Sequence, residues 1–188
     1  RFRGEELLDA PYETLRAMRG DRVAYIFQDP LATLHPLYRV GEQLIEAIRA
    51  HERTSRKAAR ARALDLLKSV RIPNAESRLN DYPHQMSGGM RQRVGIAMAL
   101  ANDPDVIIAD EPTTALDVTV QAQILALLDD LRRERGLAIV FITHDFGVVA
   151  QLCDRVAVMY AGRIVEEGPT REVLDRPAHP YSRRLIAC

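Results

Sequence analysis

Two adjacent carboxylates, Asp110 and Glu111, stand directly after an apolar run at residues 106–109 and before Pro112. The run predicts a short buried strand, and open α/β sheets bind ligands at the carboxyl ends of their strands. An aspartate at a strand end can hold Mg²⁺ through water, and the neighbouring glutamate can accept a proton from an attacking water or orient it. A bare Asp-Glu pair is more often a pair of surface acids. The longer sequence at residues 106–117 is far more specific and favours phosphate chemistry.

A serine and two glycines, Ser87-Gly88-Gly89, precede a segment at residues 90–100 with helical character. Serine is a good N-cap, and glycines let backbone N–H groups come close to a ligand. The amino end of a helix offers unpaired N–H groups and the positive end of a dipole, which suit a phosphate. A simple capped helix explains Ser-Gly-Gly alone equally well. The Met-Arg-Gln-Arg sequence at residues 90–93 shifts the balance toward a phosphate site.

Two further polar side chains follow apolar strands. Gln28 comes after the predicted strand at residues 23–27, and His144 comes after the one at residues 137–142. Alone, Gln28 is a weak signal and a histidine there is more often structural. A neutral amide could orient Mg²⁺ or water, and a histidine could hydrogen-bond a terminal phosphate. Because parallel strands end at one edge of a sheet, we expect Gln28, Asp110-Glu111 and His144 to converge there.

The elements that must position these residues alternate in the second half of the chain. The patterns predict strands at 23–27, 106–109 and 137–142, helices at 90–100 and 118–135, and a hairpin of 155–160 with 163–165. Gly136 is expected to end the long helix as its C-cap residue. Alternating strands and helices predict an α/β domain with a mostly parallel sheet. The helical stretch from about 33 to 101 interrupts the alternation and predicts an inserted subdomain.

Composition narrows the class of protein. The 188 residues have a formal net charge of zero, are 47% hydrophobic and 28% charged, and include two cysteines. These values are typical of a soluble globular domain, argue against a nucleic-acid partner, and favour a reducing compartment. No apolar run approaches the roughly 20 residues that span a membrane. The basic stretch at 53–62 predicts a solvated helix face, with contact to anionic lipid as the alternative.

Taken together, these motifs resemble those of ATP-binding-cassette (ABC) nucleotide-binding domains over nearly the whole chain. The family's conserved motifs correspond to Phe27-Gln28-Asp29-Pro30 as Q-loop, residues 86–93 as signature, 106–111 as Walker B with the catalytic glutamate, 115–117 as D-loop and 143–145 with the switch histidine. Residues 109–124, 158–162 and 179–182 are similar to the oligopeptide/dipeptide branch of bacterial importers.

The resemblance implies a P-loop NTPase-type (RecA-like) α/β fold, a mostly parallel sheet core with an inserted ABC α-helical subdomain. It divides the chain by motif. Residues 1–32 are a partial RecA-like core up to the Q-loop, and 33–101 are the helical subdomain with the signature. Residues 102–168 are core with Walker B, D-loop and switch histidine, and 169–188 begin a C-terminal extension.

The resemblance also implies an ATPase subunit that energises import of peptides, or in relatives nickel or glutathione. Its cofactors are ATP and Mg²⁺. Asp110 and Gln28 are the expected Mg²⁺ residues, acting through water, and Glu111 and His144 join Gln28 in catalysis. A partner's ATP is expected to meet the signature residues Ser87, Gly88, Gly89 and Gln92, and Asp117 is expected to contact the dimer partner.

The partners implied are a second nucleotide-binding domain, identical or paralogous, the transmembrane permease subunits and, indirectly, a periplasmic or extracellular solute-binding protein. No nucleic-acid partner is expected, and the implied location is peripheral, at the cytoplasmic face of the bacterial inner membrane. The alternative is a non-transport ABC ATPase in DNA repair or translation. The peptide-branch stretches and the absence of a basic excess argue against that alternative.

One expected motif is missing from the 188 residues. The phosphate-binding loop Gly-x-x-x-x-Gly-Lys-Ser/Thr does not occur, because neither Lys57 nor Lys68 follows a glycine. In the family this loop lies upstream of the Q-loop. We therefore expect the sequence to be a fragment of a longer protein and to be inactive alone.

Overall fold

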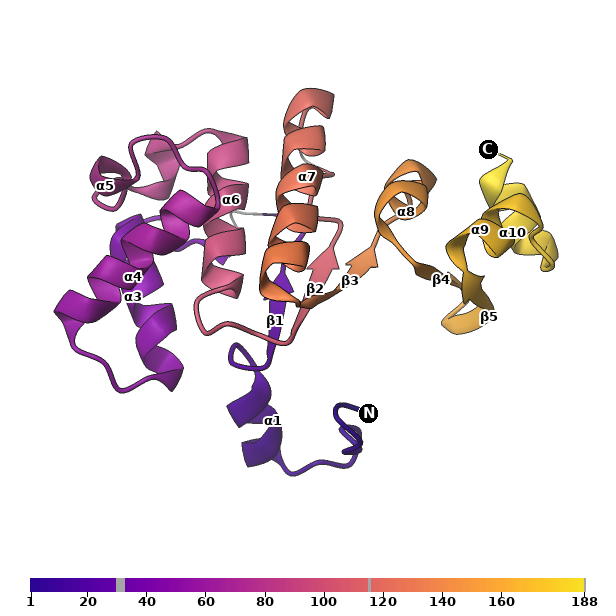
Figure 1. Cartoon of the computed structure of the whole chain (residues 1–188), viewed down its shortest axis with the longest axis horizontal. Coiled ribbons are helices and arrows are strands. Elements are labelled where there is room, and N and C mark those ends of the chain that lie inside the picture. Colours follow the sequence, from indigo (N-terminus) through magenta and orange to yellow (C-terminus); the bar gives the residue numbers. More distant parts are fainter. Residues whose placement is uncertain (30–32, 115, 188) are drawn as a thin grey trace. The chain divides into compact units, whose positions relative to one another are not determined.

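The structure is a computed structural model that describes residues 1–29, 33–114 and 116–187. By its internal contacts the chain divides into two compact units, Arg1–Val140 and Phe141–Cys188. The four-part division by motif remains a prediction. The elements, in chain order and labelled in Figure 1, are α1 (Tyr12–Met18), β1 (Val23–Ile26), α3 (Val40–His51), α4 (Arg56–Ser69), α5 (Ala75–Arg78), the 3-10 turn η1 (Pro83–Gln85), α6 (Gly88–Ala99), β2 (Val106–Asp110), α7 (Val118–Arg135), β3 (Ala138–Ile142), α8 (Phe146–Leu152), β4 (Arg155–Tyr160), β5 (Arg163–Pro169), α9 (Thr170–Asp175) and α10 (Pro180–Ile186).

The sheet that carries the candidate site has the strand order β1-β2-β3. β1 and β2 run parallel, with Val23 opposite Val106 and Ile26 opposite Ala109. Side chains alternate between the two faces of a strand. One face of the β1–β2 pair is buried through Ala24, Ile26, Ile107 and Ala109. Tyr25 lies on the opposite face with 38% of its surface exposed. The predicted parallel α/β core is therefore confirmed.

A layer of helices is inserted between β1 and β2, as the sequence predicted. α3 packs on α4 and α6, and α4 also packs on α5 and α6 (Figure 1). Their contact surface is apolar and fully buried at Leu44, Ile48, Ala59, Ala63, Leu67, Val94 and Ile96. Burial of each leucine or isoleucine in such a layer stabilises the fold by about 1.5–3 kcal/mol. This layer fixes the direction from which α6 approaches the sheet.

Most element boundaries agree with the sequence patterns, and the differences have local causes. α7 begins and ends where predicted, and Gly136 closes it with a φ of 64°. Residues 40–70, within the predicted helical insertion, form two helices, and Ser55 starts the second by accepting a hydrogen bond from the Ala58 N–H. α6 begins at Gly88, two residues earlier than predicted. β5 extends to Pro169, beyond the predicted 163–165.

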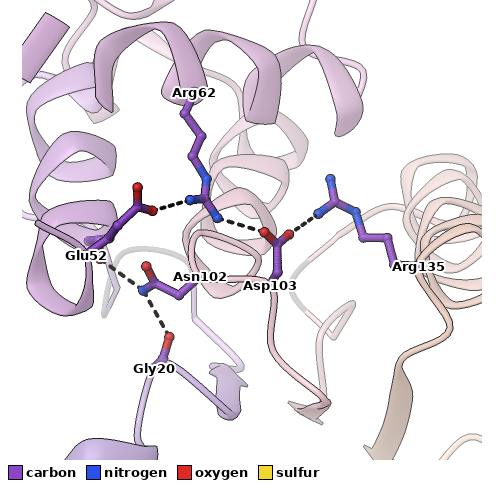
Figure 2. A network of polar contacts seen from close by, with 7 residues as sticks. Gly20, Glu52, Arg62, Asn102, Asp103 and Arg135 are labelled. Carbon is purple, nitrogen blue, oxygen red and sulfur yellow. Dashed lines mark hydrogen bonds and ion pairs between the residues drawn. The ribbon is translucent and has the colours of Figure 1, made fainter. Parts of the chain in front are cut away.

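The segment between α6 and β2 is tied to both the helical layer and α7 (Figure 2). The Asn102 amide donates to the carbonyl oxygens of Gly20 and Ala47, each at 3.1 Å. The Asp103 carboxylate accepts from Arg62 of α4 at 2.8 Å and from Arg135 of α7 at 2.7 Å. Arg62 also pairs with Glu52, at the end of α3. These bonds hold the start of β2 against the elements around it.

The basic stretch at residues 53–62 lies mostly on the exposed side of α4, as the solvated-face interpretation predicted. Arg56 pairs with Glu42, and Arg60 donates to Asn80 at 3.2 Å. Some of this charge is therefore neutralised within the helical layer.

The second unit is organised around the predicted β4–β5 hairpin. The strands are antiparallel, and the turn uses left-handed backbone at Ala161 and Gly162, with φ of 48° and 76°. The Glu166 carboxylate on β5 accepts the backbone N–H groups of Ala178 and His179 at 2.7 and 3.1 Å. These bonds tie the start of α10 to the hairpin.

Candidate nucleotide-binding site

The ends of β1 and β2 bring two predicted site residues into contact. Their parallel register places Gln28 just past the end of β1 and Asp110-Glu111 at the end of β2. The Gln28 side-chain amide donates to Glu111 Oε2 at 2.7 Å. These two groups therefore meet at the carboxyl edge of the sheet, where α/β folds bind ligands.

Glu111 is held by more than Gln28. The Thr114 hydroxyl, three residues along the chain, donates to the same Oε2 at 3.0 Å. The Glu111 backbone has a φ of 42°, a left-handed conformation that side-chain-bearing residues seldom adopt. Unusual backbone of this kind persists where the surrounding structure enforces it, and it clusters at functional sites. The turn after β2 thus fixes both the backbone and the carboxylate of Glu111.

Asp110 has a separate partner. The Tyr25 hydroxyl donates to Asp110 Oδ2 at 2.6 Å. This hydrogen bond, together with the negative charge of Asp110, raises the pKa of the Tyr25 phenol above its ordinary value. The phenol therefore stays a hydrogen-bond donor at neutral pH. Each carboxylate of the pair thus receives a donor from β1 or from the residues just after it.

The oxygen atoms at this edge fit Mg²⁺ chemically. Within the described parts of the chain, no group of three or more His, Cys, Asp or Glu side chains is placed to hold a metal. Mg²⁺ keeps several waters and is typically held by one or two carboxylates together with substrate phosphates. Asp110 suits that mode better than a site made wholly of protein ligands, and the amide oxygen of Gln28 is a further neutral acceptor at the same edge of the sheet.

The amino end of α6 is the second candidate region. Ser87 caps the helix, and its hydroxyl oxygen accepts the Met90 N–H at 3.3 Å. Ser87 is exposed, while Gly88 and Gly89 are half-buried, and the first turn carries no acidic side chain. The first N–H groups of a helix have no partner inside it. A phosphate is the kind of ligand that this helix end attracts.

Gly89 has a packing role that the sequence alone did not indicate. A Cβ atom built on Gly89 would lie 2.6 Å from Cγ1 of Val120, in the first turn of α7. A Cβ on Gly88 would lie 3.6 Å from Leu116 Cδ2, which is an ordinary contact. The second glycine therefore lets α6 and α7 approach closely, and Leu116, just before α7, lies beside the start of α6.

Gln92, Asp117 and His144 are the other predicted site residues. Gln92 is only 2% exposed, because the second turn of α6 faces the core, so its amide is not on the surface that Ser87 presents. Asp117 caps α7, and its Oδ1 accepts the Val120 N–H at 2.9 Å. His144 is exposed and lies two residues after β3, in the second unit. Their predicted contacts with nucleotide or with a partner remain predictions.

Sequence reasoning missed Tyr25 and Thr114. Thr114 lies three residues after Glu111, a spacing that suits a side-chain contact across a turn. Tyr25 could have been found from strand register: it is opposite Ile108, so Asp110 is its diagonal neighbour on the same face. That register becomes known only once β1 and β2 are paired.

A family model described as ABC transporter matches residues 1–114, more than half of the chain. The chain belongs to the ABC transporter family. This cassette sequence is 56% identical to a probable peptide ABC transporter ATP-binding protein of Sinorhizobium fredii, over 98% of the chain and 55% of that protein. It is 53% identical to the oligopeptide transport ATP-binding protein OppD of Bacillus subtilis, over 99% of the chain and 52% of that protein. The cassette sequence thus spans about half the length of these relatives.

Solved cassettes share the fold. The ATP-binding cassette MJ0796, solved as a dimer bound to ADP and Pi, matches 87% of this cassette chain and 69% of its own, with a TM-score of 0.74 and 35% identity. CbiO1 of Clostridium perfringens, part of the cbiONQ complex, matches with a TM-score of 0.73 and 31% identity, over 87% of this chain and 62% of its own. In the residues described for our cassette, no helix is both long and apolar enough to span a bilayer.

Proposed function

We propose that the full-length protein is the ATP-hydrolysing subunit of a bacterial ABC importer for peptides. The ATPase proposal rests on one observation: Asp110 and Glu111 lie side by side at the carboxyl edge of the sheet, and each accepts a hydrogen bond from a side chain of residues 25–28. Two carboxylates at one strand end can divide the work between a cation and a water. Phosphoryl transfer depends mainly on positioning and charge stabilisation, which such an edge supplies.

In this proposal each residue has one task. Asp110 holds Mg²⁺ through water, with Gln28 beside it, and the cation neutralises phosphate charge when it is bound. Glu111 accepts a proton from the attacking water or orients it. His144 hydrogen-bonds the γ-phosphate of ATP. Gln28 donates to Glu111 at 2.7 Å, so Gln28 would link the bound cation to the catalytic carboxylate.

The amino end of α6 serves a second cassette. Ser87, Gly88 and Gly89 offer N–H groups to the ATP of a partner, and Asp117 contacts that partner across the dimer. Support comes from the dimeric state of the similar cassette MJ0796. The partner is a copy of this chain or a paralogue. Gln92, the fourth signature residue, is buried in α6, and its contact with the partner's ATP remains a prediction.

Peptides are the proposed cargo because the relatives that cover nearly the whole chain carry that function in their names. They include the S. fredii and B. subtilis proteins and a probable D,D-dipeptide transport ATP-binding protein of Escherichia coli, 52% identical over 98% of the chain. Nickel or glutathione is the alternative cargo. The permease subunits hold the cassette at the cytoplasmic face of the membrane and, with a solute-binding protein, select the solute.

The Glu111→Gln variant of the full-length protein tests the proposed chemistry. We expect turnover to fall about a hundredfold or more, the usual contribution of a general base. ATP binding should persist, so an ATP-bound dimer accumulates and is detected by light scattering after gel filtration. Glu134→Gln on the exposed end of α7 is the matched control and should leave turnover unchanged. Unchanged turnover in Glu111→Gln refutes the role of Glu111.

The transport assignment needs its own experiment. We expect the full-length protein to copurify with transmembrane permease subunits, and its deletion to abolish growth on peptides as the sole nitrogen source. Association with ribosomes or DNA, with peptide growth intact, would instead support a non-transport ABC ATPase.

A further inference from the structure

We propose that Tyr25 is a positioning residue for Asp110: its hydroxyl holds one carboxylate oxygen so that the other faces the divalent cation of the ATP site. The proposal rests on the proposed function, because it takes Asp110 as the cation-holding residue. It adds a residue that lies on a different strand and carries no charge.

The strand register places Tyr25 for this task. Tyr25 is opposite Ile108 in the parallel pair, and Asp110 is two residues further along β2 on the same face. Diagonal neighbours of this kind are about 7–8 Å apart at Cα, within reach of an aromatic side chain. The phenol spans that gap and ends 2.6 Å from Asp110 Oδ2.

The tyrosine ring is supported on its strand. Its centroid lies 4.6 Å from that of Phe27, two residues along, with the ring planes tilted by 45°. Tilted aromatic pairs at this distance attract each other. Tyr25 also has few rotatable bonds, so less freedom is lost when its hydroxyl is fixed on the carboxylate than with a long flexible side chain. The donor is therefore placed before any ligand binds.

With this hydrogen bond in place, the two carboxylate oxygens of Asp110 have different partners. An O–H donor to an ionised carboxylate makes a short, charge-assisted hydrogen bond, as observed at Oδ2. Oδ1 can then accept from a water of the cation. Carboxylates that serve metals are commonly oriented by hydrogen bonds from neighbouring groups, and loss of such a group weakens metal binding about ten- to a hundredfold.

The region after β1 treats the second carboxylate in the same way. Gln28 donates to Glu111 Oε2, as Tyr25 donates to Asp110 Oδ2. The two donors are three residues apart in the sequence, and the two acceptors are adjacent. Residues 25–28 thus supply one donor to each carboxylate of the Asp-Glu pair, and Tyr25 is the donor to the carboxylate that is proposed to hold the cation.

The test is Tyr25→Phe in the full-length protein, with Mn²⁺ as the probe. Phenylalanine keeps the ring beside Phe27 and removes only the hydroxyl. Binding of Mn²⁺ is followed by electron paramagnetic resonance with a non-hydrolysable ATP analogue present. We expect the Mn²⁺ dissociation constant to rise about tenfold. At saturating Mn²⁺ the turnover should recover to near wild type, whereas a merely structural defect would lower it at every Mn²⁺ concentration.

Two further variants separate the possible failures. Asp110→Asn should lose Mn²⁺ binding almost completely, and Tyr12→Phe on α1 should match wild type. If Asp110→Asn weakens Mn²⁺ binding but Tyr25→Phe does not, the positioning role of Tyr25 is overturned and the proposed function stands. If Asp110→Asn binds Mn²⁺ normally, the assignment of Asp110 fails and the role of Tyr25 fails with it.

Discussion

At the carboxyl ends of β1 and β2 the proposed chemistry is carried by side chains, whereas at the amino end of α6 it is carried by the backbone. Glu111 and Asp110 depend on donors that approach from β1, Gln28 at 2.7 Å and Tyr25 at 2.6 Å. The helix end depends instead on a missing side chain, because a Cβ on Gly89 would lie 2.6 Å from Val120. One region is therefore set by contacts that are present, and the other by space that must be left for a neighbouring helix.

This difference predicts different responses to substitution. At the strand ends, removing a donor should change metal or water chemistry and leave folding largely intact. At the helix end, adding a side chain should change either helix packing or phosphate binding, depending on which glycine is replaced. Gly88 and Gly89 separate these two effects, since only Gly89 is tightly packed against α7.

The largest expected effect tests whether the two regions act on one ATP from different subunits. Gly88→Asp places a negative charge where a phosphate is proposed to bind, yet it suits the helix dipole and meets only an ordinary contact at Leu116. Gly88→Asp and Glu111→Gln should each lower turnover about a hundredfold or more. Mixed as differently tagged copies, they should regain turnover, because one of the two shared sites in each mixed dimer is intact. Random mixing allows up to about a quarter of the wild-type rate.

Each variant mixed with wild type is the control, and tandem purification on the two tags confirms that mixed dimers form. If isolated mixed dimers stay as inactive as either variant alone, the two regions do not complete one another across a dimer of this chain.

The next effect concerns stability. Gly89→Ala should destabilise the fold by about 1–3 kcal/mol, because its Cβ cannot fit beside Val120 without a shift of α6 or α7. Gly95→Ala is the matched control in the same helix: nothing outside the helix lies within 4 Å of a Cβ there, so alanine should stabilise by about 0.5–1 kcal/mol. Urea unfolding measures both free energies.

Relief of the same contact should rescue the variant. Gly89→Ala should therefore destabilise the Val120→Ala variant much less than it destabilises the wild type. If Gly89→Ala costs the same free energy in both backgrounds, the glycine is needed for its backbone conformation and not for the close approach of α7.

The sequence predicted the candidate site residues better than the contacts that hold them in place. Local apolar patterns and capping chemistry predicted strands at residues 106–109 and 23–27, the long helix ended by Gly136 and the cap at Ser87. The structure confirms these features, with the strands at 106–110 and 23–26. These features depend on residues that are close along the chain, so a single sequence contains enough information to predict them.

The supporting contacts depend on residues far apart along the chain. Tyr25 and Asp110 are separated by 85 positions, and their meeting requires both the pairing and the register of two strands. The packing role of Gly89 could not be predicted because Val120, the residue it packs against, belongs to another helix. The burial of Gln92 likewise depends on how α6 packs on the other helices, which the motif does not indicate.

The smallest expected effect concerns the segment that joins the two regions. Asp103 lies between the end of α6 and the start of β2, and its carboxylate bridges Arg62 and Arg135 (Figure 2). Asp103 is 66% exposed at its side chain, so Asp103→Asn should cost about 1 kcal/mol or less, and the loss should shrink in high salt. Asparagine tolerates the left-handed backbone at this position, where φ is 50°, whereas Asp103→Ala should cost roughly 1–2 kcal/mol more. Urea unfolding at low and high salt measures both variants. A loss of Mn²⁺ affinity or turnover in Asp103→Asn, at unchanged stability, would show that this bridge sets the geometry of the strand-end region and does more than fasten the chain that leads to it.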